Sequence, residues 1–455
     1  MTHDSRNVSK NTLFIAIKGS TSDGHQYIET SIQAGACSIL LSCDDLFQTL
    51  KSKYPTVDFF LYQKPDGHRI LALTSEFFYN FPAKKLRLIG VTGTNGKTTT
   101  ASIINFLIRS SGEKTAIIGT NAYDLDGEIL TASHTTPDPI QLQTLFCRCL
   151  DKGITTVIME VSSHSAHQQR TGSAKFESLI FTNLTGEHLD YHRNMENYFK
   201  AKKSLFENAL SNDGLAIINI DDQWGMKLFK QFLSHQPFGF DLNIGKFKTL
   251  SNGSTFQFKE TLIKTQLFGK FNAANAIGAM LATQKHGISE SECLKWLSTF
   301  VGVAGRMQSI KLSTGATAFV DYAHTDDALL NVGQALKELP HRRIITVFGC
   351  GGDRDRTKRP RMAKAAEKIS DQVIVTADNS RSEDINEIMK DIKSGFNNPE
   401  FPLYISSRKL AIEKAVAISK SGDIILVAGK GHEDYQIEHG ITTHFSDFET
   451  LSLLK

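Results

Sequence analysis

One segment of the sequence has the residue types that bind a polyphosphate. Residues 90–100 read Gly-Val-Thr-Gly-Thr-Asn-Gly-Lys-Thr-Thr-Thr, between an apolar run and an amphipathic helical pattern. Backbone N–H groups of a glycine-rich turn and of a helix amino terminus attract phosphate oxygens. Lys97 can reach the β- and γ-phosphates, and the Thr98 hydroxyl can ligate Mg²⁺. The residues expected to contact ATP here are Gly93, Thr94, Asn95, Gly96, Lys97, Thr98 and Thr99. Val91 stands where the first glycine of GxxxxGK[ST] belongs, so a turn without a nucleotide is the alternative.

Two other loops carry side chains that could hold a metal ion. Glu160 lies at the end of a strand-like run, where a carboxylate can bind Mg²⁺. Because two serines follow it closely, a helix cap is the alternative. His188 lies in the second loop between the acids Glu187 and Asp190, where it is either a metal ligand or an ordinary satisfied histidine.

These loops follow short runs rich in β-branched and aliphatic residues, most of which precede a helical pattern. Such alternation predicts parallel strands in doubly wound α/β domains, whose ligands bind at the carboxyl ends of the strands. The clearest runs are 86–91, 156–161, 178–182, 215–220, 318–320, 343–348, 372–376 and 423–427.

Length and composition limit the class of protein. A chain of 455 residues predicts about three domains. Its 51 Lys and Arg against 48 Asp and Glu leave a net charge of +3, too small to indicate nucleic acid or a membrane as the partner. The six cysteines form no CxxC pair, so neither a disulfide framework nor a structural metal is indicated. A polar amino terminus and the lack of a long apolar stretch predict a cytoplasmic protein.

Two short segments give weak signals of a domain boundary. Phe-Pro-Ala-Lys-Lys at 81–85 precedes the first long strand-like run, and 302–306 lies between a helical pattern and a new series of strands. We therefore expect domains at 1–85, 86–303 and 304–455.

Several blocks of the sequence resemble one known family. They are GTNGKTT (93–99), MEVSSH (159–164), NLTGEHLDYH (183–192), GRM (305–307), DYAH (321–324) and GKGHEDYQ (429–436). Together they resemble the Mur ligases, and within them the members that add a diamino acid to a UDP-N-acetylmuramoyl dipeptide. The resemblance runs from 4 to 436. It implies a small N-terminal α/β domain for the UDP-sugar, a central P-loop ATPase-like doubly wound sheet and a Rossmann-like C-terminal domain. Relative to the family, the chain is expected to be short at its amino end.

The resemblance also implies roles for individual residues. The UDP-sugar and its peptide would contact Ser5, Ser20, Thr21, Ser22, Thr135, Thr136, Ser162, Gln168 and Arg170. For 20–23 alone, an ordinary polar turn is the alternative. The ATP site would be completed by Asn275, Arg306 and Asp321, with Tyr322 and His324.

A lysine of the segment 194–206 would be carbamylated, and alignment selects Lys202. A carbamate converts the cation into an anion, which suits Mg²⁺ beside a polyphosphate. Without the family, the pair Lys202 and Lys203 is a solvated helix face. The implied metal ligands are Thr98, Glu160, His188 and carbamylated Lys202, and the implied catalytic residues are Lys97, Lys202, His188 and Glu160.

The third domain carries the residues that would choose the amino acid. They are Arg354, Asp378, Asn379, Ser380, Arg381, Gly429 and Glu433. In the family, members that add meso-diaminopimelate read Asp-Asn-Pro-Arg at this loop, and members that add lysine lack the arginine. Arg381 is kept here, whereas Ser380 replaces the proline and is expected to loosen the loop. An arginine fork matches the second carboxylate of diaminopimelate. Without the family, Arg354 and Arg356 are a solvated surface.

The implied activity is ATP-dependent amide ligation through an acyl phosphate, with ATP and Mg²⁺ required. The expected substrates are UDP-N-acetylmuramoyl-L-alanyl-D-glutamate and meso-diaminopimelate, and a monomer is expected. Three alternatives stay open: the same ligase using L-lysine or another diamino acid, a folylpolyglutamate-synthetase-like ligase, and a non-catalytic nucleotide-binding module.

Overall fold

The structure is a computed structural model that describes residues 1–19, 22–63, 67–232 and 235–455. Contacts group the chain into two compact units. Unit 1 consists of Met1–Thr92, Glu113–Leu179 and Lys200–Ala216, and unit 2 consists of Gly93–Gly112, Ile180–Phe199 and Ile217–Lys455. The division into three domains stays a prediction. Within the described ranges, no helix is long and apolar enough to cross a lipid bilayer.

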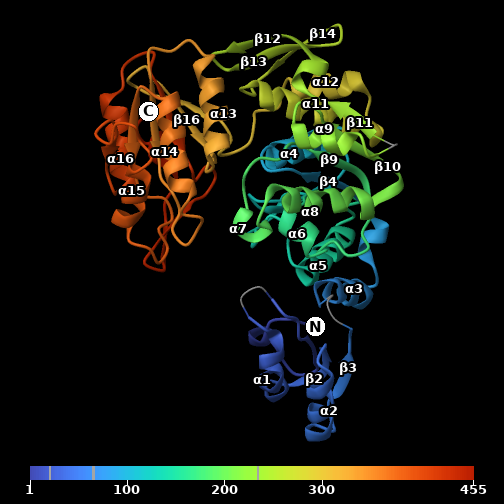
Figure 1. Cartoon of the computed structure of the whole chain (residues 1–455). Coiled ribbons are helices and arrows are strands. Elements are labelled where there is room, and N and C mark those ends of the chain that lie inside the picture. Colours follow the sequence, from blue (N-terminus) through green and yellow to red (C-terminus); the bar gives the residue numbers. More distant parts are fainter. Residues whose placement is uncertain (20–21, 64–66, 233–234) are drawn as a thin grey trace. The chain divides into compact units, whose positions relative to one another are not determined.

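The first sheet is small and parallel, with the order β1-β2-β3 (Figure 1, blue). Its strands are β1 (Thr12–Ile15), β2 (Ala36–Leu41) and β3 (Asp58–Leu61). The helices of this region are α1 (Ile28–Gln33), α2 (Asp44–Lys53) and α3 (Gly67–Phe78). The apolar side chains of β1 and β2 are buried with those of α1 and α2, including Phe14, Ile39 and Leu50.

The second sheet has eight strands in the order β11-β10-β9-β4-β8-β5-β6-β7. The strands are β4 (Arg87–Thr92), β5 (Thr115–Ile118), β6 (Tyr123–Leu125), β7 (Glu128–Leu130), β8 (Thr156–Glu160), β9 (Phe176–Phe181), β10 (Leu210–Asn219) and β11 (His235–Phe238). Strands β4, β8 and β5 are parallel, whereas β6 and β7 extend the edge in antiparallel pairs. Each residue of β8 is buried, as is typical of a strand covered on both faces.

Some of the helices that follow these strands begin at residues with capping chemistry. Asp138 caps α5 and Ser162 caps α6, each through its side-chain oxygen. The helices are α4 (Lys97–Ser110), α5 (Pro139–Asp151), α6 (Ser163–His167), α7 (Leu189–His192), α8 (Met195–Asn208), α9 (Gln223–Phe229), α10 (Phe240–Asn243), α11 (Lys270–Lys285) and α12 (Glu290–Leu297). A three-stranded antiparallel sheet precedes α11 and consists of β12 (Ile244–Leu250), β13 (Gly253–Phe258) and β14 (Thr261–Thr265).

The third large sheet has the order β15-β16-β20-β17-β18-β19, and only its edge pair β15–β16 is antiparallel among the pairs the structure describes. Its strands are β15 (Gln308–Lys311), β16 (Thr317–Asp321), β17 (Ile344–Phe348), β18 (Gln372–Val375), β19 (Leu403–Tyr404) and β20 (Ile424–Ala428). The helices are α13 (Asp326–Lys337), α14 (Lys358–Ile369), α15 (Ile385–Lys393), α16 (Arg408–Ile418) and α17 (Asp447–Ser452). A hairpin, β21 (Tyr435–Glu438) and β22 (Ile441–His444), follows β20.

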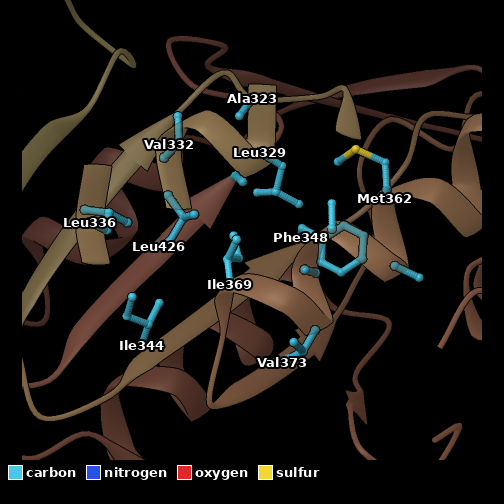
Figure 2. Close-up of a cluster of buried hydrophobic side chains, with 14 of the residues drawn as sticks. Ala323, Leu329, Val332, Leu336, Ile344, Phe348, Met362, Ile369, Val373 and Leu426 are labelled. Atoms are coloured by element: carbon cyan, nitrogen blue, oxygen red, sulfur yellow. The ribbon is translucent and has the colours of Figure 1, made fainter. Parts of the chain in front are cut away.

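Both faces of this sheet are covered by helices. Successive strand residues point to opposite faces, so neighbouring side chains pack in different layers. Leu426 of β20 packs with α13, α14 and α15, and Figure 2 shows it among Leu336, Ile369 and Phe348. Its neighbour Val427 packs with α16 and α17 on the other face. Helices on both faces of a largely parallel sheet make this a doubly wound α/β fold, as predicted.

Each predicted strand is present, with ends shifted by up to a few residues. The largest shift is at β10, which begins at Leu210 rather than at 215. Strands β1–β3, β5–β7, β11–β15, β19, β21 and β22 lie outside the predicted runs. Several of them lack the continuous apolar runs of the central strands: β6 and β7 have three residues each, and β12 has no buried residue.

Candidate active site

The phosphate loop connects β4 to α4, as its sequence predicts. Gly93 has a φ of 150°, and a Cβ atom there would lie 1.9 Å from the Oγ1 atom of Thr182. Gly96 has a φ of 86°, and a Cβ atom there would lie 2.8 Å from the Oδ1 atom of Asn275. Both positions therefore require glycine. Val91 is a buried residue inside β4, so the missing first glycine falls in the strand and leaves the turn itself unchanged.

Residues after β9 hold the loop in shape. The backbone N–H of Asn95 donates to Oδ1 of Asn183 at 2.9 Å, and the Thr182 hydroxyl donates to the Asn95 carbonyl oxygen at 2.6 Å. The Asn95 side chain donates from Nδ2 to Oδ2 of Asp327 at 3.0 Å. The loop is thus fixed by hydrogen bonds on two sides before any ligand binds, which is the preorganisation that anion binding needs.

Three predicted nucleotide residues meet at this loop within unit 2. The Nζ atom of Lys97 lies 3.0 Å from the carbonyl oxygen of Gly93 and 2.7 Å from that of Thr94. Arg306 donates from Nη2 to the Thr98 hydroxyl at 3.1 Å. Asn275 lies against Gly96. The loop is therefore flanked by the amide and the guanidinium that the family resemblance assigned to the nucleotide.

Asp321 holds the segment that carries Arg306. Its carboxylate accepts the backbone N–H groups of Met307 and Ala323, each at 2.7 Å. Burial raises the pKa of Asp321, although the neighbouring Arg306 opposes the shift. These bonds hold the segment next to Arg306, and contact of Asp321 with ATP stays a prediction.

His188 lies at the start of α7 beside an acid that was not among the predicted site residues. Its Nε2 atom is 3.6 Å from Oε2 of Glu187, whose other oxygen lies 3.0 Å from Nε2 of His324. Burial opposes ionisation of Glu187, but the two histidines keep the pKa of its carboxyl well below the usual range. Glu187 stands beside His188 in the sequence, and this adjacency was the available signal for it.

Glu160 is fully buried in unit 1 and binds the loop after β5. Its carboxylate accepts the backbone N–H of Thr120 at 2.9 Å and the Thr120 hydroxyl at 3.0 Å. The cap of α6 is Ser162, which accepts the N–H of Ser165. The alternative of Glu160 as a helix cap is therefore wrong. Thr120 was missed, since an isolated threonine in a loop gives no signal.

The residues expected to hold the sugar-peptide gather around Thr136. The Thr136 hydroxyl lies 3.4 Å from the Ser162 hydroxyl, and the Thr136 carbonyl oxygen accepts Nη1 of Arg170 at 2.6 Å. Arg170 also donates to Oε1 of Gln168, and Thr135 hydrogen-bonds Thr120.

Ser5 and Ser22 are not joined to this group. Ser5 lies in a short 3-10 helix, Ser5–Asn7, and Ser22 is exposed. Within the described parts of the chain, neither serine hydrogen-bonds the Thr136 group. Ser20 and Thr21 lie outside the described residues.

Lys202 is buried on α8, and its Nζ atom lies 3.4 Å from the hydroxyl of Thr92 at the end of β4. The adjacent Lys203 is partly exposed and pairs with Glu207 one turn further on. A solvated face thus describes Lys203, and it is wrong for Lys202.

The two loops predicted to bind the amino acid lie side by side after β18 and β20. Asn379 donates from Nδ2 to Oε2 of Glu433 at 2.9 Å, and Lys430 bridges both side chains at 3.1 and 3.0 Å. A Cβ atom on Gly429 would lie 2.8 Å from Oδ2 of Asp378. Burial opposes ionisation, but Arg408 and Lys430 keep the pKa of Asp378 below its usual value.

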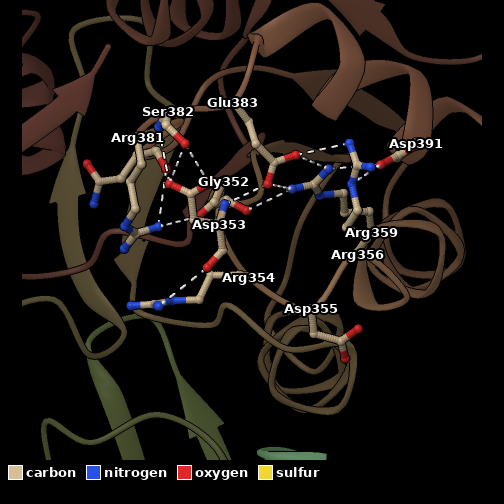
Figure 3. A network of polar contacts seen from close by, with 12 residues as sticks. Gly352, Asp353, Arg354, Asp355, Arg356, Arg359, Arg381, Ser382, Glu383 and Asp391 are labelled. Carbon is tan, nitrogen blue, oxygen red and sulfur yellow. Dashed lines mark hydrogen bonds and ion pairs between the residues drawn. The ribbon is translucent and has the colours of Figure 1, made fainter. Parts of the chain in front are cut away.

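The side chains of Arg381 and Arg354 both lie against Gly351. A Cβ atom on Gly351 would lie 2.9 Å from Nη1 of Arg381 and 3.8 Å from Cγ of Arg354. Arg381 has a φ of 55° and donates from Nη1 to the Gly352 carbonyl oxygen at 2.8 Å (Figure 3). Arg354 is exposed.

The other arginines of this charged run are bound in ion pairs. Arg356 and the buried Arg359 pair with Glu383 and Asp391, on the far side of the network from Arg381 (Figure 3). Arg354 and Arg381 thus lie outside that cluster of ion pairs, against Gly351.

Comparison with known proteins identifies the family of the chain. The family model described as Mur ligase middle domain matches residues 91–283, the Mur ligase glutamate ligase domain matches 305–431, and the Mur ligase family catalytic domain matches 1–70. A UDP-N-acetylmuramoyl-L-alanyl-D-glutamate–2,6-diaminopimelate ligase of Parabacteroides distasonis is 41% identical over 457 residues, which cover 98% of this chain and 92% of the relative. The chain belongs to the Mur ligase family. As a Mur ligase, it is an ATP-dependent ligase that acts on small-molecule substrates.

Solved structures give the same fold for this Mur ligase. A structure of a UDP-N-acetylmuramoyl-L-alanyl-D-glutamate–2,6-diaminopimelate ligase is 30% identical with a TM-score of 0.68, and the match covers 100% of this chain and 93% of that one. A Mycobacterium tuberculosis folylpolyglutamate synthase complexed with ADP and AMPPCP is 18% identical with a TM-score of 0.67, over 79% of this chain and 92% of that one. At that identity, the second likeness shows the fold alone.

Proposed function

We propose that this Mur ligase joins meso-diaminopimelate to UDP-N-acetylmuramoyl-L-alanyl-D-glutamate, with ATP as the energy source, in the cytoplasmic synthesis of a cell-wall precursor. The observation that carries the proposal is that Arg381 and Arg354 both lie against Gly351, next to the two loops that hold Asn379 and Glu433. The two named diaminopimelate ligases of the comparison support the same amino acid.

The reaction proceeds in two steps of group transfer. A carboxylate oxygen of the D-glutamyl residue attacks the γ-phosphorus of ATP, ADP leaves, and an acyl phosphate forms. The amine of diaminopimelate then attacks the acyl carbon, phosphate leaves, and the nitrogen loses a proton. Placement of the reacting groups supplies much of the acceleration. Lys97 and Arg306, both at the phosphate loop, offset the charge of the transferring phosphoryl group.

We infer that the enzyme uses a magnesium site of the kind that nucleotides use. Within the described ranges, no three His, Cys, Asp or Glu side chains gather in a way that could hold a metal. Mg²⁺ beside a nucleotide usually takes one or two carboxylates and completes its shell with phosphate oxygens and water. We assign its protein ligands to Thr98, Glu160, His188 and carbamylated Lys202. When bound, Mg²⁺ neutralises phosphate charge.

Selection of the amino acid falls to the C-terminal loops. Asp378 and Glu433 are acceptors for the ammonium groups, and Arg381 and Arg354 bind the carboxylate that L-lysine lacks. A hydrogen bond to a charged group contributes about 1.5 to 3 kcal/mol, so each lost bond weakens binding roughly tenfold to a hundredfold.

The test is phosphate release from ATP with the UDP-dipeptide and meso-diaminopimelate, L-lysine or no amino acid. Turnover with diaminopimelate alone is expected. Preference for lysine would keep the ligase and overturn the role of Arg381. Absence of turnover with either amino acid would overturn the proposal.

A further inference from the structure

The loop after β20 packs directly on the segment that carries Arg306. Gly305 has a φ of 67°, and a Cβ atom there would lie 2.0 Å from the backbone nitrogen of His432. The Gly305 carbonyl oxygen accepts the N–H of Tyr322 at 2.9 Å. On the other side, a Cβ atom on Gly431 would lie 2.7 Å from Cβ of Tyr322. The three segments are thus in backbone contact, and a shift of one displaces the others.

Tyr322 lies at the centre of this contact. The guanidinium carbon of Arg306 lies 4.5 Å from the centroid of the Tyr322 ring, and the His432 ring lies 5.2 Å from the same ring. Cation–π contacts of this kind are stabilising, and more so where the pair is shielded from water. The Tyr322 ring therefore contacts both Arg306, which reaches the phosphate loop, and His432, which belongs to the predicted amino-acid loop.

Both rings in this contact are neutral near neutral pH. Burial, and then the carboxylates of Glu433 and Asp378, raise the pKa of the Tyr322 phenol above its usual value. Burial, and then Arg306, lower the pKa of His432 to about 4. A neutral imidazole and a neutral phenol can lie beside a guanidinium without repulsion.

The far end of Arg306 reaches the phosphate loop through its 3.1 Å hydrogen bond to Thr98. A continuous series of contacts therefore runs from the loop of Gly429 and Glu433, through His432 and Tyr322, to Arg306 and the phosphate loop. The roles that the family resemblance implies for these residues do not include such a connection.

We propose that Tyr322 and His432 are positioning residues that couple binding of the diamino acid to binding of the nucleotide. The inference rests on the proposed function, because it takes diaminopimelate as the ligand of the 429–433 loop. A bound amino acid orders that loop, which fixes His432 against Tyr322 and so fixes Arg306 at the phosphate loop. Linkage makes the effect reciprocal, so the nucleotide strengthens amino-acid binding by the same factor.

The test compares the affinity for β,γ-imido-ATP, with Mg²⁺ and the UDP-dipeptide present, with and without saturating meso-diaminopimelate. For the wild type, we expect diaminopimelate to tighten nucleotide binding at least about fivefold, the lower end of typical coupling. Tyr322→Leu should reduce this ratio to less than about twofold, and Tyr322→Phe, which keeps the ring, should preserve it. A merely structural role would change the affinities without changing their ratio.

The matched control is Tyr404→Leu, which removes another tyrosine ring that lies under a cation, with Nζ of Lys393 at 5.3 Å. This control should keep the wild-type ratio. A wild-type ratio of one, or an unchanged ratio in Tyr322→Leu, overturns the inference. If Tyr322→Leu fails to fold, His432→Leu decides the question in the same way. Failure of the proposed function is distinguishable, because the wild type would then release no phosphate with diaminopimelate.

Discussion

Arg381 donates a 2.8 Å hydrogen bond from Nη1 to the carbonyl oxygen of Gly352, which fixes the direction of its guanidinium. An arginine held in this way presents its remaining donors in a constant orientation, and a carboxylate can accept two of them at once. The specificity of the ligase is therefore open to a direct test at this side chain.

Arg381→Ala is expected to raise the KM for meso-diaminopimelate by roughly tenfold to a hundredfold, because charged hydrogen bonds are lost. The constant with which L-lysine inhibits as a competitor should stay unchanged, since lysine has no second carboxylate. Steady-state kinetics with diaminopimelate, in the absence and presence of L-lysine, measure both values. The matched control is Arg356→Ala, which removes an exposed arginine of the same network that pairs with Glu383. Equal losses for both amino acids would contradict the role given to Arg381.

The adjacent lysines of α8 provide a second matched pair. Lys202→Met keeps the side-chain volume but cannot be carbamylated, and we expect kcat to fall roughly a hundredfold or more through loss of electrostatic stabilisation. Lys203→Met should behave like the wild type, since Lys203 is partly exposed and pairs only locally with Glu207 among the contacts described.

The same residue predicts a dependence on carbon dioxide. A neutral lysine amine adds to CO₂ and loses a proton to become a carbamate, so wild-type activity should fall in CO₂-depleted buffer and return with bicarbonate. Activity that does not respond to bicarbonate would show that Lys202 acts as an amine.

The contact between Glu160 and Thr120 predicts a graded effect. Glu160→Gln removes the charge while it keeps the shape, and kcat should fall by roughly two to three orders of magnitude. Thr120→Val removes only the hydroxyl bond and keeps the backbone N–H bond, so a loss of about tenfold is expected. Phosphate release at increasing Mg²⁺ concentration measures both variants. A lower kcat for Thr120→Val than for Glu160→Gln would contradict this order.

Glu383 predicts acid sensitivity of the C-terminal domain. Hydrogen bonds from Arg359 are the main cause that lowers the pKa of Glu383 to about 2, from an ordinary value of 4.5. Between these values the unfolded state binds the proton and the native state does not, so native stability declines as the pH falls through this window. Thermal unfolding of Glu383→Gln should show lower stability at neutral pH and a shallower decline between pH 4.5 and 2. Glu387→Gln, at a carboxylate that is more than half exposed, is the control and should follow the wild type.

Much of this fold could be predicted because its central strands are continuous apolar runs. β8 and β17 are buried along their whole length, and their bounds follow the predicted runs to within one residue. β12 could not be predicted in the same way, because it has no fully buried position and carries exposed lysines. Local pattern identifies most strands that are covered on both faces, although the four-residue β5 was missed as well, and it gives no signal for an exposed strand such as β12.

The residues of the candidate site could likewise be predicted where the signal is local, and they were missed where it depends on distant parts of the chain. The phosphate loop could be predicted because its glycines serve backbone geometry, which is a local property. The burial of Lys202 could not be predicted from its helix, because it depends on where α8 packs. Thr120 and Asp327 were missed because each acts on a residue distant in sequence, Glu160 and Asn95 respectively.

The hairpin β21–β22 has a consequence for the loop that carries Ser380. The backbone N–H of Ile437, in β21, donates to Oδ1 of Asn379 at 3.0 Å, and its carbonyl oxygen accepts the N–H of Arg381 at 3.1 Å. The loop is thus braced from outside by a strand, in a chain where serine replaces a stiffening proline. Amino-acid preference in this ligase could therefore be retuned by redesign of a surface hairpin, with every side chain of the pocket left as it is.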